Sequence, residues 1–523
     1  MDTLELVAAV VVAVLAGAWF SRRSRRSEPV VLLAVGVLIG LTPLGDAELS
    51  PHVVLFLFLP ALLYWEALNS SVHLIRSNLR AITLQATLLV VATAAAVAAV
   101  AHLLGLPWPI GLVLGAVLAP TDAVAVSAVS GSLPRRTLTV LRTESLLNDG
   151  TALVLLAVTL EFLVEGEPLS VGGTALRLAE SFGGGIAIGA AVAYLLVPIR
   201  RRLGEPILHS GLSVATPMLA FLPAELIHVS GVLAVVTCGL LTSRIAPRHI
   251  EAQARRQSYA FWEVTAFLLN GALFVLIGTQ IPGVVGGLSS TGLRDATVIA
   301  VLVALTVIVV RLAWFYTVPY VVRALDRRAA QRSLRISPRE RLPIAWAGMR
   351  GAISLAAALT VPVATASGAP IEQRDAIVFI TAVTVTLTLV LLGPTLPLVT
   401  RAVRLPADHE GAREAEVVRQ RIAARVQREL PALLERFPAP RAASGIAEES
   451  YLPEQETDDP SAARALRTAV LDVKRDELGR IRAEGTLDDD VLRAEESVLD
   501  AEAVHVSHAT HSDSDVVDGP RRS

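Results

Sequence analysis

The sequence predicts an all-α polytopic membrane protein, with about thirteen transmembrane helices followed by a helical tail. Two observations predict this fold class. Of the 523 residues, 53% are hydrophobic and only 18% are charged, and mean hydropathy is +0.57, whereas soluble domains are about 25% charged. Apolar runs long enough to cross a bilayer also recur from Leu4 to about Thr400, and a charged segment without such runs follows them.

The apolar runs divide the chain into two predicted domains. Residues 1–405 form a transmembrane domain, and residues 406–523 form a charged, partly disordered helical tail, with disorder expected after His505. Helical periodicity in the tail covers 415–434 and 461–503. The thirteen runs, separated by short polar loops, are 4–20, 29–45, 53–68, 81–104, 108–131, 139–165, 174–199, 207–228, 230–246, 258–281, 295–324, 343–366 and 376–401.

Basic residues in the loops predict the orientation of the chain. Clusters such as Arg22–Arg26 and Arg200–Arg202 fall in odd-numbered loops, which hold roughly twenty basic residues against about two in the even-numbered loops. Because cytoplasmic loops are rich in Lys and Arg, we expect the N-terminus outside and the tail in the cytoplasm. The first run follows an acidic Met1–Leu6 and precedes its arginines, unlike a cleavable signal peptide. The expected location is the plasma membrane, with multiple crossings.

An odd number of runs fits two inverted six-helix repeats joined by the seventh. Runs five and twelve are then equivalent, and each is interrupted, by Ala119–Asp122 in one and Gly348–Gly351 in the other. Unwound helices at matching positions of two repeats indicate a transport site. Gly and Pro are common in membrane helices for other reasons, but each of these breaks also carries a charge.

The stretch Glu144–Asp149 is the most polar part of any run. An acid near the middle of a bilayer costs roughly 2.5–3.5 kcal/mol, so two acids here need partners or a function. Ser145 and Asp149 lie one helical turn apart, and Glu144 and Asn148 lie one turn apart on the neighbouring stripe. One stripe can therefore hold an ion while the other supports the architecture.

Two further acids and one arginine in the apolar runs need an explanation. Glu66 is late in its run, Asp122 follows a proline at one break, and Arg350 lies at the other break. Arg350 needs an acidic partner, because an unpaired guanidinium in hydrocarbon is very costly. The remaining acids give the core a surplus negative charge that cations or protons must neutralise. A bound cation favours the ionised carboxylate, whereas burial favours the protonated one. The cation and the proton therefore compete for one site, and that competition is the basis of antiport.

The chemistry of these side chains indicates a hard monovalent cation. Carboxylate, hydroxyl and carbonyl oxygens suit such an ion, and no His/Cys cluster lines the runs. The lone Cys238 excludes an intramolecular disulfide or a cysteine metal site. His505, His508 and His511 could bind a metal, but a solvated tail is the preferred interpretation. We expect no cofactor, and Na⁺ and H⁺ as the transported ions.

The chain resembles the sodium/proton exchangers of the monovalent cation:proton antiporter-1 family, bacterial branch. The resemblance covers residues 5–405, with its motifs in family order. Each motif is weak alone, whereas the ordered set is highly specific. The matching stretches are Phe58–Leu63 with Glu66, Ala119–Val126, Glu144–Asp149, His228–Val236, Phe261–Glu263 with Asn270 and Phe274, and Trp346–Ser354.

The resemblance implies a role for each site residue. Asp149 is the carboxylate that carries Na⁺ or H⁺. The resemblance also implies electroneutral one-for-one exchange, because an asparagine precedes this aspartate, and a homodimer whose six-helix core moves against a dimerisation domain. The remaining implied roles are Na⁺ ligands at Ser145, Glu66 and the Thr121 carbonyl, Asp122 close to them, an ion pair between Glu144 and Arg350, and Asn148 as a brace for the crossing of the interrupted helices.

Alternative interpretations remain for single residues and for the function. Asp149 could be a structural acid, Glu66 could extend to the interface, Asp122 could cap a half-helix, and Ser145 could bond its own helix. We assign no ion-binding role to Arg311, Glu161 or Glu180. The leading hypothesis is Na⁺/H⁺ exchange by alternating access, with Li⁺ as another cation; the alternatives are a K⁺/H⁺ antiporter, a cation channel and an ion sensor.

Overall fold

The structure, a computed structural model, describes residues 2–24, 26–43, 54–70, 72–122, 125–126, 133, 135–165, 171–203, 205–245, 252–287, 290–325, 337–365, 367–404, 410–438 and 460–517. Within these ranges the regular structure is helical, apart from one isolated β-bridge between Ala364 and Pro370. The predicted all-α fold class is confirmed.

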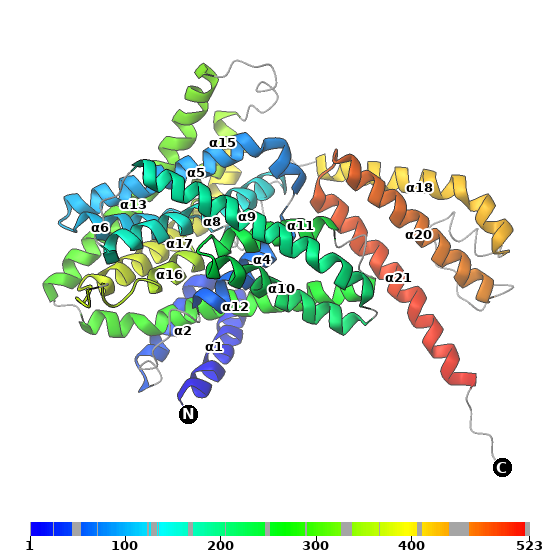
Figure 1. The fold of residues 1–523 in the computed structure, drawn as a ribbon, viewed down its shortest axis with the longest axis horizontal. Coiled ribbons are helices and arrows are strands. Elements are labelled where there is room, and N and C mark those ends of the chain that lie inside the picture. The colour runs from blue at the N-terminus through cyan, green and yellow to red at the C-terminus, as the bar shows by residue number, and fades with distance from the viewer. Residues whose placement is uncertain are drawn as a thin grey trace, which may run out of the picture.

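Every predicted apolar run overlaps at least one helix (Figure 1). Among the described residues, seven helices are long and apolar enough to cross a membrane, and five shorter apolar helices accompany them. The number of thirteen crossings and the inverted repeats remain predictions. In chain order the elements of this bundle are α1 (Asp2–Ser24), α2 (Glu28–Gly40), the π-helix η2 (Val54–Phe58), α4 (Leu59–Asn69), α5 (Val72–Leu103), α6 (Trp108–Leu118), α8 (Arg135–Glu165), α9 (Val171–Arg202), α10 (Pro206–Leu226), α11 (Gly231–Ile245), α12 (Ala252–Gly287), α13 (Ser290–Leu325), α15 (Pro338–Trp346), α16 (Ala352–Leu359) and α17 (Arg374–Val403).

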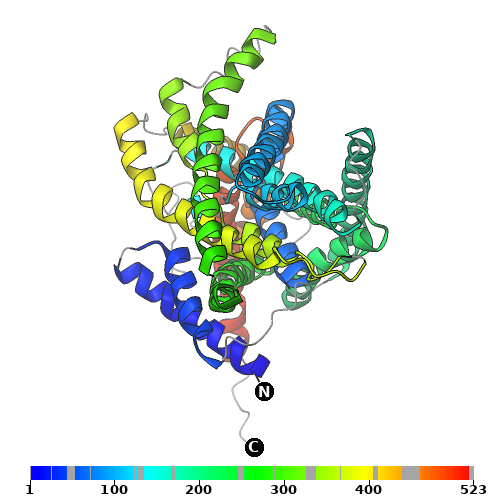
Figure 2. The same ribbon diagram turned by 90° about the vertical axis from the view of Figure 1, so that its left-hand side faces the viewer.

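Helices far apart in the sequence pack side by side, α2 on α12 and α5 on α13 (Figures 1 and 2). Glycine permits the closest of these approaches. A Cβ atom on Gly36 would lie 2.1 Å from the carbonyl oxygen of Val275, and one on Gly278 would lie 2.4 Å from that of Leu33. Small residues let membrane helices gain backbone packing that larger side chains prevent. This contact fixes α2 against α12, and both helices line the cavity described below.

Two helices are interrupted where the sequence predicts. The chain is not helical at 119–122, after α6, or at 347–351, between α15 and α16. Pro120 disfavours a helical residue before it and cannot donate a backbone hydrogen bond. The two breaks meet, because the N–H of Asp122 donates to the carbonyl oxygen of Met349 over 2.9 Å. Non-helical backbone at membrane depth is tolerated when it is buried in protein in this way.

The tail forms three helices beside the bundle, α18 (Glu410–Arg436), α20 (Pro460–Glu484) and α21 (Asp489–Val517) (Figure 1). They bury a shared apolar core that includes Val418, Leu478 and Leu492. The predicted stretch 415–434 lies within α18, and the predicted stretch 461–503 is divided between α20 and α21 by a break at 485–488. The division of the chain at 405/406 stays a prediction.

The last tail helix is longer than the sequence predicts. α21 continues past His505 to Val517, where disorder is expected. Adding a turn to an existing helix costs far less than nucleating one, so the packed first half of α21 supports its extension. The side chains of the histidine triplet lie outside the described residues.

The tail contacts the bundle through α21. Arg255 of α12 donates from Nε to Asp500 at 2.7 Å, and its Nη1 lies 3.5 Å from Glu496. Arg493 donates to the carbonyl oxygen of Asn69 at 2.7 Å, at the C-terminal end of α4, where a cation also favours the helix dipole. The tail therefore contacts both α12 and the helix that carries Glu66.

Candidate ion-binding site

The break after α6 is held by polar side chains of α8. The hydroxyl of Ser145 donates to the carbonyl oxygen of Thr121 at 2.6 Å, and the Asn148 side-chain amide donates to the Thr121 hydroxyl at 3.2 Å. Ser145 thus bonds across to the unwound segment. Ser145 and Asn148 belong to the two neighbouring stripes predicted on α8, and both bond to Thr121 in the break.

Asp149 lies deep in this crossing. It is 2% exposed, and its Oδ2 atom is buried without a hydrogen-bond partner among the described residues. The charges of Glu66 and Asp122 are near enough to act on it. A buried carboxylate oxygen is costly when it is left without a partner, so this atom is suited to receive a proton or a cation.

Glu66 and Asp122 face a cavity of about 260 Å³. The other polar groups in its wall are Glu28 from α2 and Glu263 and Asn270 from α12, among apolar side chains. Asp149 is not one of the lining residues. The cavity therefore reaches two of the predicted acids directly, and it holds two further acids, Glu28 and Glu263, that the sequence interpretation did not assign to the site.

Asp122 has two roles in the structure. Its Oδ1 atom accepts a hydrogen bond of 3.1 Å from the backbone N–H of Ala125, which is the geometry of a helix cap. It also lines the cavity beside Glu66. The capping interpretation is thus correct for one oxygen, and the residue still lies next to the predicted ion path.

The predicted ion pair between Glu144 and Arg350 is wrong. Glu144 Oε1 instead accepts a hydrogen bond from Arg311 Nη1 of α13 at 2.6 Å, and both side chains are buried. Asn148, the predicted brace, also donates to Glu144 Oε1, at 3.5 Å. The sequence interpretation gave Arg311 no ion-binding role. The signal in the sequence is that Arg311 is the only charged residue between Ala296 and Val322.

Arg350 finds neutral acceptors. Its Nε donates to the carbonyl oxygen of Leu118 at 2.9 Å, and its Nη1 donates to that of Gly348 at 2.5 Å. These carbonyls are available because Leu118 ends α6, where the last carbonyls have no partner within the helix, and Gly348 lies in the break before α16. Glu144 still attracts this guanidinium through space, and Arg311 repels it. Arg350 therefore ties the two interrupted helices together without a direct ionic partner among the described residues.

Comparison with known proteins assigns the family. A family model described as "Sodium/hydrogen exchanger, transmembrane" matches residues 10–402. The chain belongs to this family. The exchanger is therefore a multi-pass membrane transporter of the cation/proton antiporter class, and not an enzyme.

Individual relatives agree with this assignment. The exchanger is 40% identical over 522 residues to an uncharacterized Na⁺/H⁺ exchanger of Mycobacterium tuberculosis, with 96% of each chain covered. It is 31% identical over 389 residues to the sodium, potassium, lithium and rubidium/H⁺ antiporter of Bacillus subtilis. This match covers 71% of this chain and 57% of the relative. The structure of a sodium proton antiporter from Methanocaldococcus jannaschii superposes with a TM-score of 0.61 at 19% identity, covering 77% of this chain and 99% of the other. That last likeness concerns the fold alone.

Gly351 is the residue that lets the two breaks approach each other. A Cβ atom there would lie 1.5 Å from Asp122 Oδ2 and 2.5 Å from Asp122 Cβ. Asp122 is too short to move aside without its backbone, so Gly351→Ala should displace it and lower ion-driven proton flux by about tenfold or more. Flux in proteoliposomes checks this expectation. Gly183→Ala is the matched control, because a Cβ there meets no atom within 4 Å, and equal flux in both variants would contradict the role of Gly351.

Proposed function

We propose that the protein exchanges Na⁺ for H⁺ at Asp149. The observation that carries this proposal is the buried Oδ2 atom of Asp149, which has no described hydrogen-bond partner and lies within the electrostatic range of two other acids. A bound proton neutralises this carboxylate. After the proton has left, a bound cation can neutralise it instead. Since one site holds one or the other, the uptake of each ion drives the release of the other.

The proposed Na⁺ ligands are oxygen atoms of four residues. Asp149 and Glu66 supply carboxylates, Ser145 supplies a hydroxyl, and Thr121 supplies the carbonyl oxygen that now accepts the Ser145 hydrogen bond. The accepting carbonyl and the donating hydroxyl each retain lone pairs that can face a cation. Asp122 stands beside this set and increases its negative potential. Oxygen donors of this kind suit a hard cation.

We further propose one-for-one, electroneutral exchange. Asn148, which precedes Asp149, has a neutral amide side chain that does not titrate, and it donates hydrogen bonds to Glu144 and Thr121. A site with a single carrying carboxylate moves one positive charge in each direction.

We propose that the region where the two interrupted helices cross moves during alternating access. In this scheme the cavity that reaches Glu66 and Asp122 is one of two alternate entrances. The same proposal includes a homodimer in the plasma membrane, with the N-terminus outside and the tail in the cytoplasm. A thiol-reactive probe on single-cysteine variants of the Cys238-free chain reports the orientation.

K⁺ is the second candidate for the cation. The Bacillus subtilis relative is named as an antiporter of sodium, potassium, lithium and rubidium, and the oxygen ligands proposed here do not by themselves discriminate between these ions.

Proton flux in proteoliposomes tests the function. The purified chain is reconstituted with an acidic interior, and Na⁺, Li⁺, K⁺ or choline is added while a pH dye and a membrane-potential dye are followed. Dissipation of the pH gradient by Na⁺ without a change in potential is the expected result. A response to K⁺ alone changes the assigned ion, and a potential that follows the cation would establish a channel or an electrogenic mechanism instead.

A further inference from the structure

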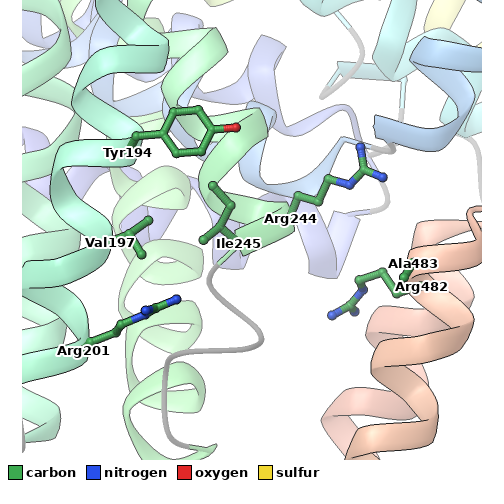
Figure 3. A pocket seen from close by; sticks show the side chains of 7 residues that line it. All are labelled: Tyr194, Val197, Arg201, Arg244, Ile245, Arg482 and Ala483. Atoms are coloured by element: carbon green, nitrogen blue, oxygen red, sulfur yellow. The ribbon is translucent and has the colours of Figure 1, made fainter.

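A second cavity lies between the bundle and the tail, away from the proposed ion site. It has a volume of about 520 Å³. Figure 3 shows that side chains of α9, α11 and α20 surround it, and that Arg201 and Arg482 point into it from opposite sides. The full lining is Tyr194, Val197, Arg201, Arg244, Ile245, Arg482 and Ala483.

The charged residues of this lining are all arginines. Arg482 is paired with Glu496 at 2.8 Å, but that carboxylate also lies 3.5 Å from Arg255 and is therefore shared. Arg244 is exposed and forms no ion pair with any residue that the structure describes. Three guanidinium groups line one cavity, and together they favour an anion between them. Guanidinium groups also match the oxygen geometry of phosphate.

The other half of the lining is apolar. Tyr194, Val197 and Arg201 are spaced by three and four residues, so they follow one face of α9, from apolar to basic. Tyr194 is 61% exposed, as expected of a tyrosine at a membrane interface. The lining therefore suits a ligand that is anionic at one end and apolar at the other.

We propose that this cavity binds the head group of an anionic phospholipid. The phosphate lies among Arg201, Arg244 and Arg482, and the first part of an acyl chain lies along Tyr194 and Val197. Basic cavities between membrane helices at one face of the bilayer commonly hold such head groups. Because Arg482 belongs to the tail and the other two arginines belong to the bundle, the bound lipid joins the two parts of the chain.

Lipid binding to the full-length protein tests this proposal. Native mass spectrometry of the detergent-solubilised chain measures the retention of phosphatidylglycerol against phosphatidylcholine of the same chain length. The expected result is a preference for phosphatidylglycerol that falls by about tenfold in the Arg201→Gln/Arg244→Gln double variant. Arg202→Gln is the matched control, since this exposed arginine is adjacent in the sequence but does not line the cavity.

Three outcomes would overturn the proposal. They are equal retention of both lipids by the unaltered chain, an undiminished preference in the double variant, and binding of soluble glycerol 3-phosphate as tight as that of the lipid. The last would assign the cavity to a free phosphate compound. The comparison of the two lipids needs no variant, so it decides the question even if the double variant does not fold. The measurement is independent of transport, so its result does not depend on the proposed Na⁺/H⁺ exchange.

Discussion

Asp149→Asn should reduce Na⁺-driven proton flux to the rate of protein-free liposomes. The side chain keeps its size, so packing in the crossing is preserved. The amide, however, neither gains nor loses a proton near neutral pH, and it has no charge to attract a cation. A carrier that can hold neither ion has no way to couple their movements. The measurement is pH-gradient dissipation in proteoliposomes, with the amount of folded protein matched by size-exclusion chromatography.

Asp375→Asn is the control for this prediction. It makes the same chemical change at the start of α17, where the side chain is 45% exposed and faces Arg374 at 3.7 Å. Its flux should equal that of the unaltered chain. Na⁺-dependent flux that persists in Asp149→Asn would move the carrying role to one of the cavity acids, Glu66 or Asp122, which Gln and Asn substitutions would then identify.

The parts of the site that could be predicted from the sequence are those fixed by local spacing. Ser145 and Asn148 lie within one turn of Asp149, and helical geometry alone brings these side chains to one region. The breaks could be predicted because Pro120 and the glycines near Arg350 act on their own neighbours. For the same reason the apolar runs predict the helices well, since hydropathy is a property of consecutive residues.

The parts that could not be predicted depend on which helices pack together. Arg311 is 167 residues from Glu144, and nothing in either segment specifies the rotation of α13 that brings them together. Periodicity likewise does not show that Glu28 and Glu263 share a cavity, because the contact of α2 with α12 is set by close glycine packing. The pairing of Arg255 with Asp500, 245 residues away, is a further example.

Arg350 shows a different limit of the sequence argument. The rule that a buried arginine needs an acid assumes that all nearby carbonyls are used within helices. At an interrupted helix this assumption fails, because the end of α6 offers free carbonyl oxygens. A break that carries an arginine therefore predicts carbonyl acceptors at least as strongly as it predicts a carboxylate.

Glu144→Gln should strongly reduce the yield of folded protein. It leaves Arg311, which is 1% exposed, without its ionic partner. Removing one member of a buried ion pair costs about 3–5 kcal/mol, a large part of the roughly 5–15 kcal/mol that stabilises a typical protein. Fluorescence-detected size-exclusion chromatography measures the monodisperse fraction, and a thermal melt of that fraction measures the loss of stability.

Second substitutions identify the partner of Glu144. Arg311→Met removes the stranded charge and keeps an unbranched side chain, so the Glu144→Gln/Arg311→Met pair should recover most of the lost yield. Glu144→Gln/Arg350→Met should recover none, because Arg311 stays unpaired and the carbonyl oxygens of Leu118 and Gly348 also lose their donor. Recovery by the Arg350 pair and not by the Arg311 pair would contradict the observed ion pair. The two double variants remove the same total charge, so a difference between them reports the geometry of the core and not its net charge.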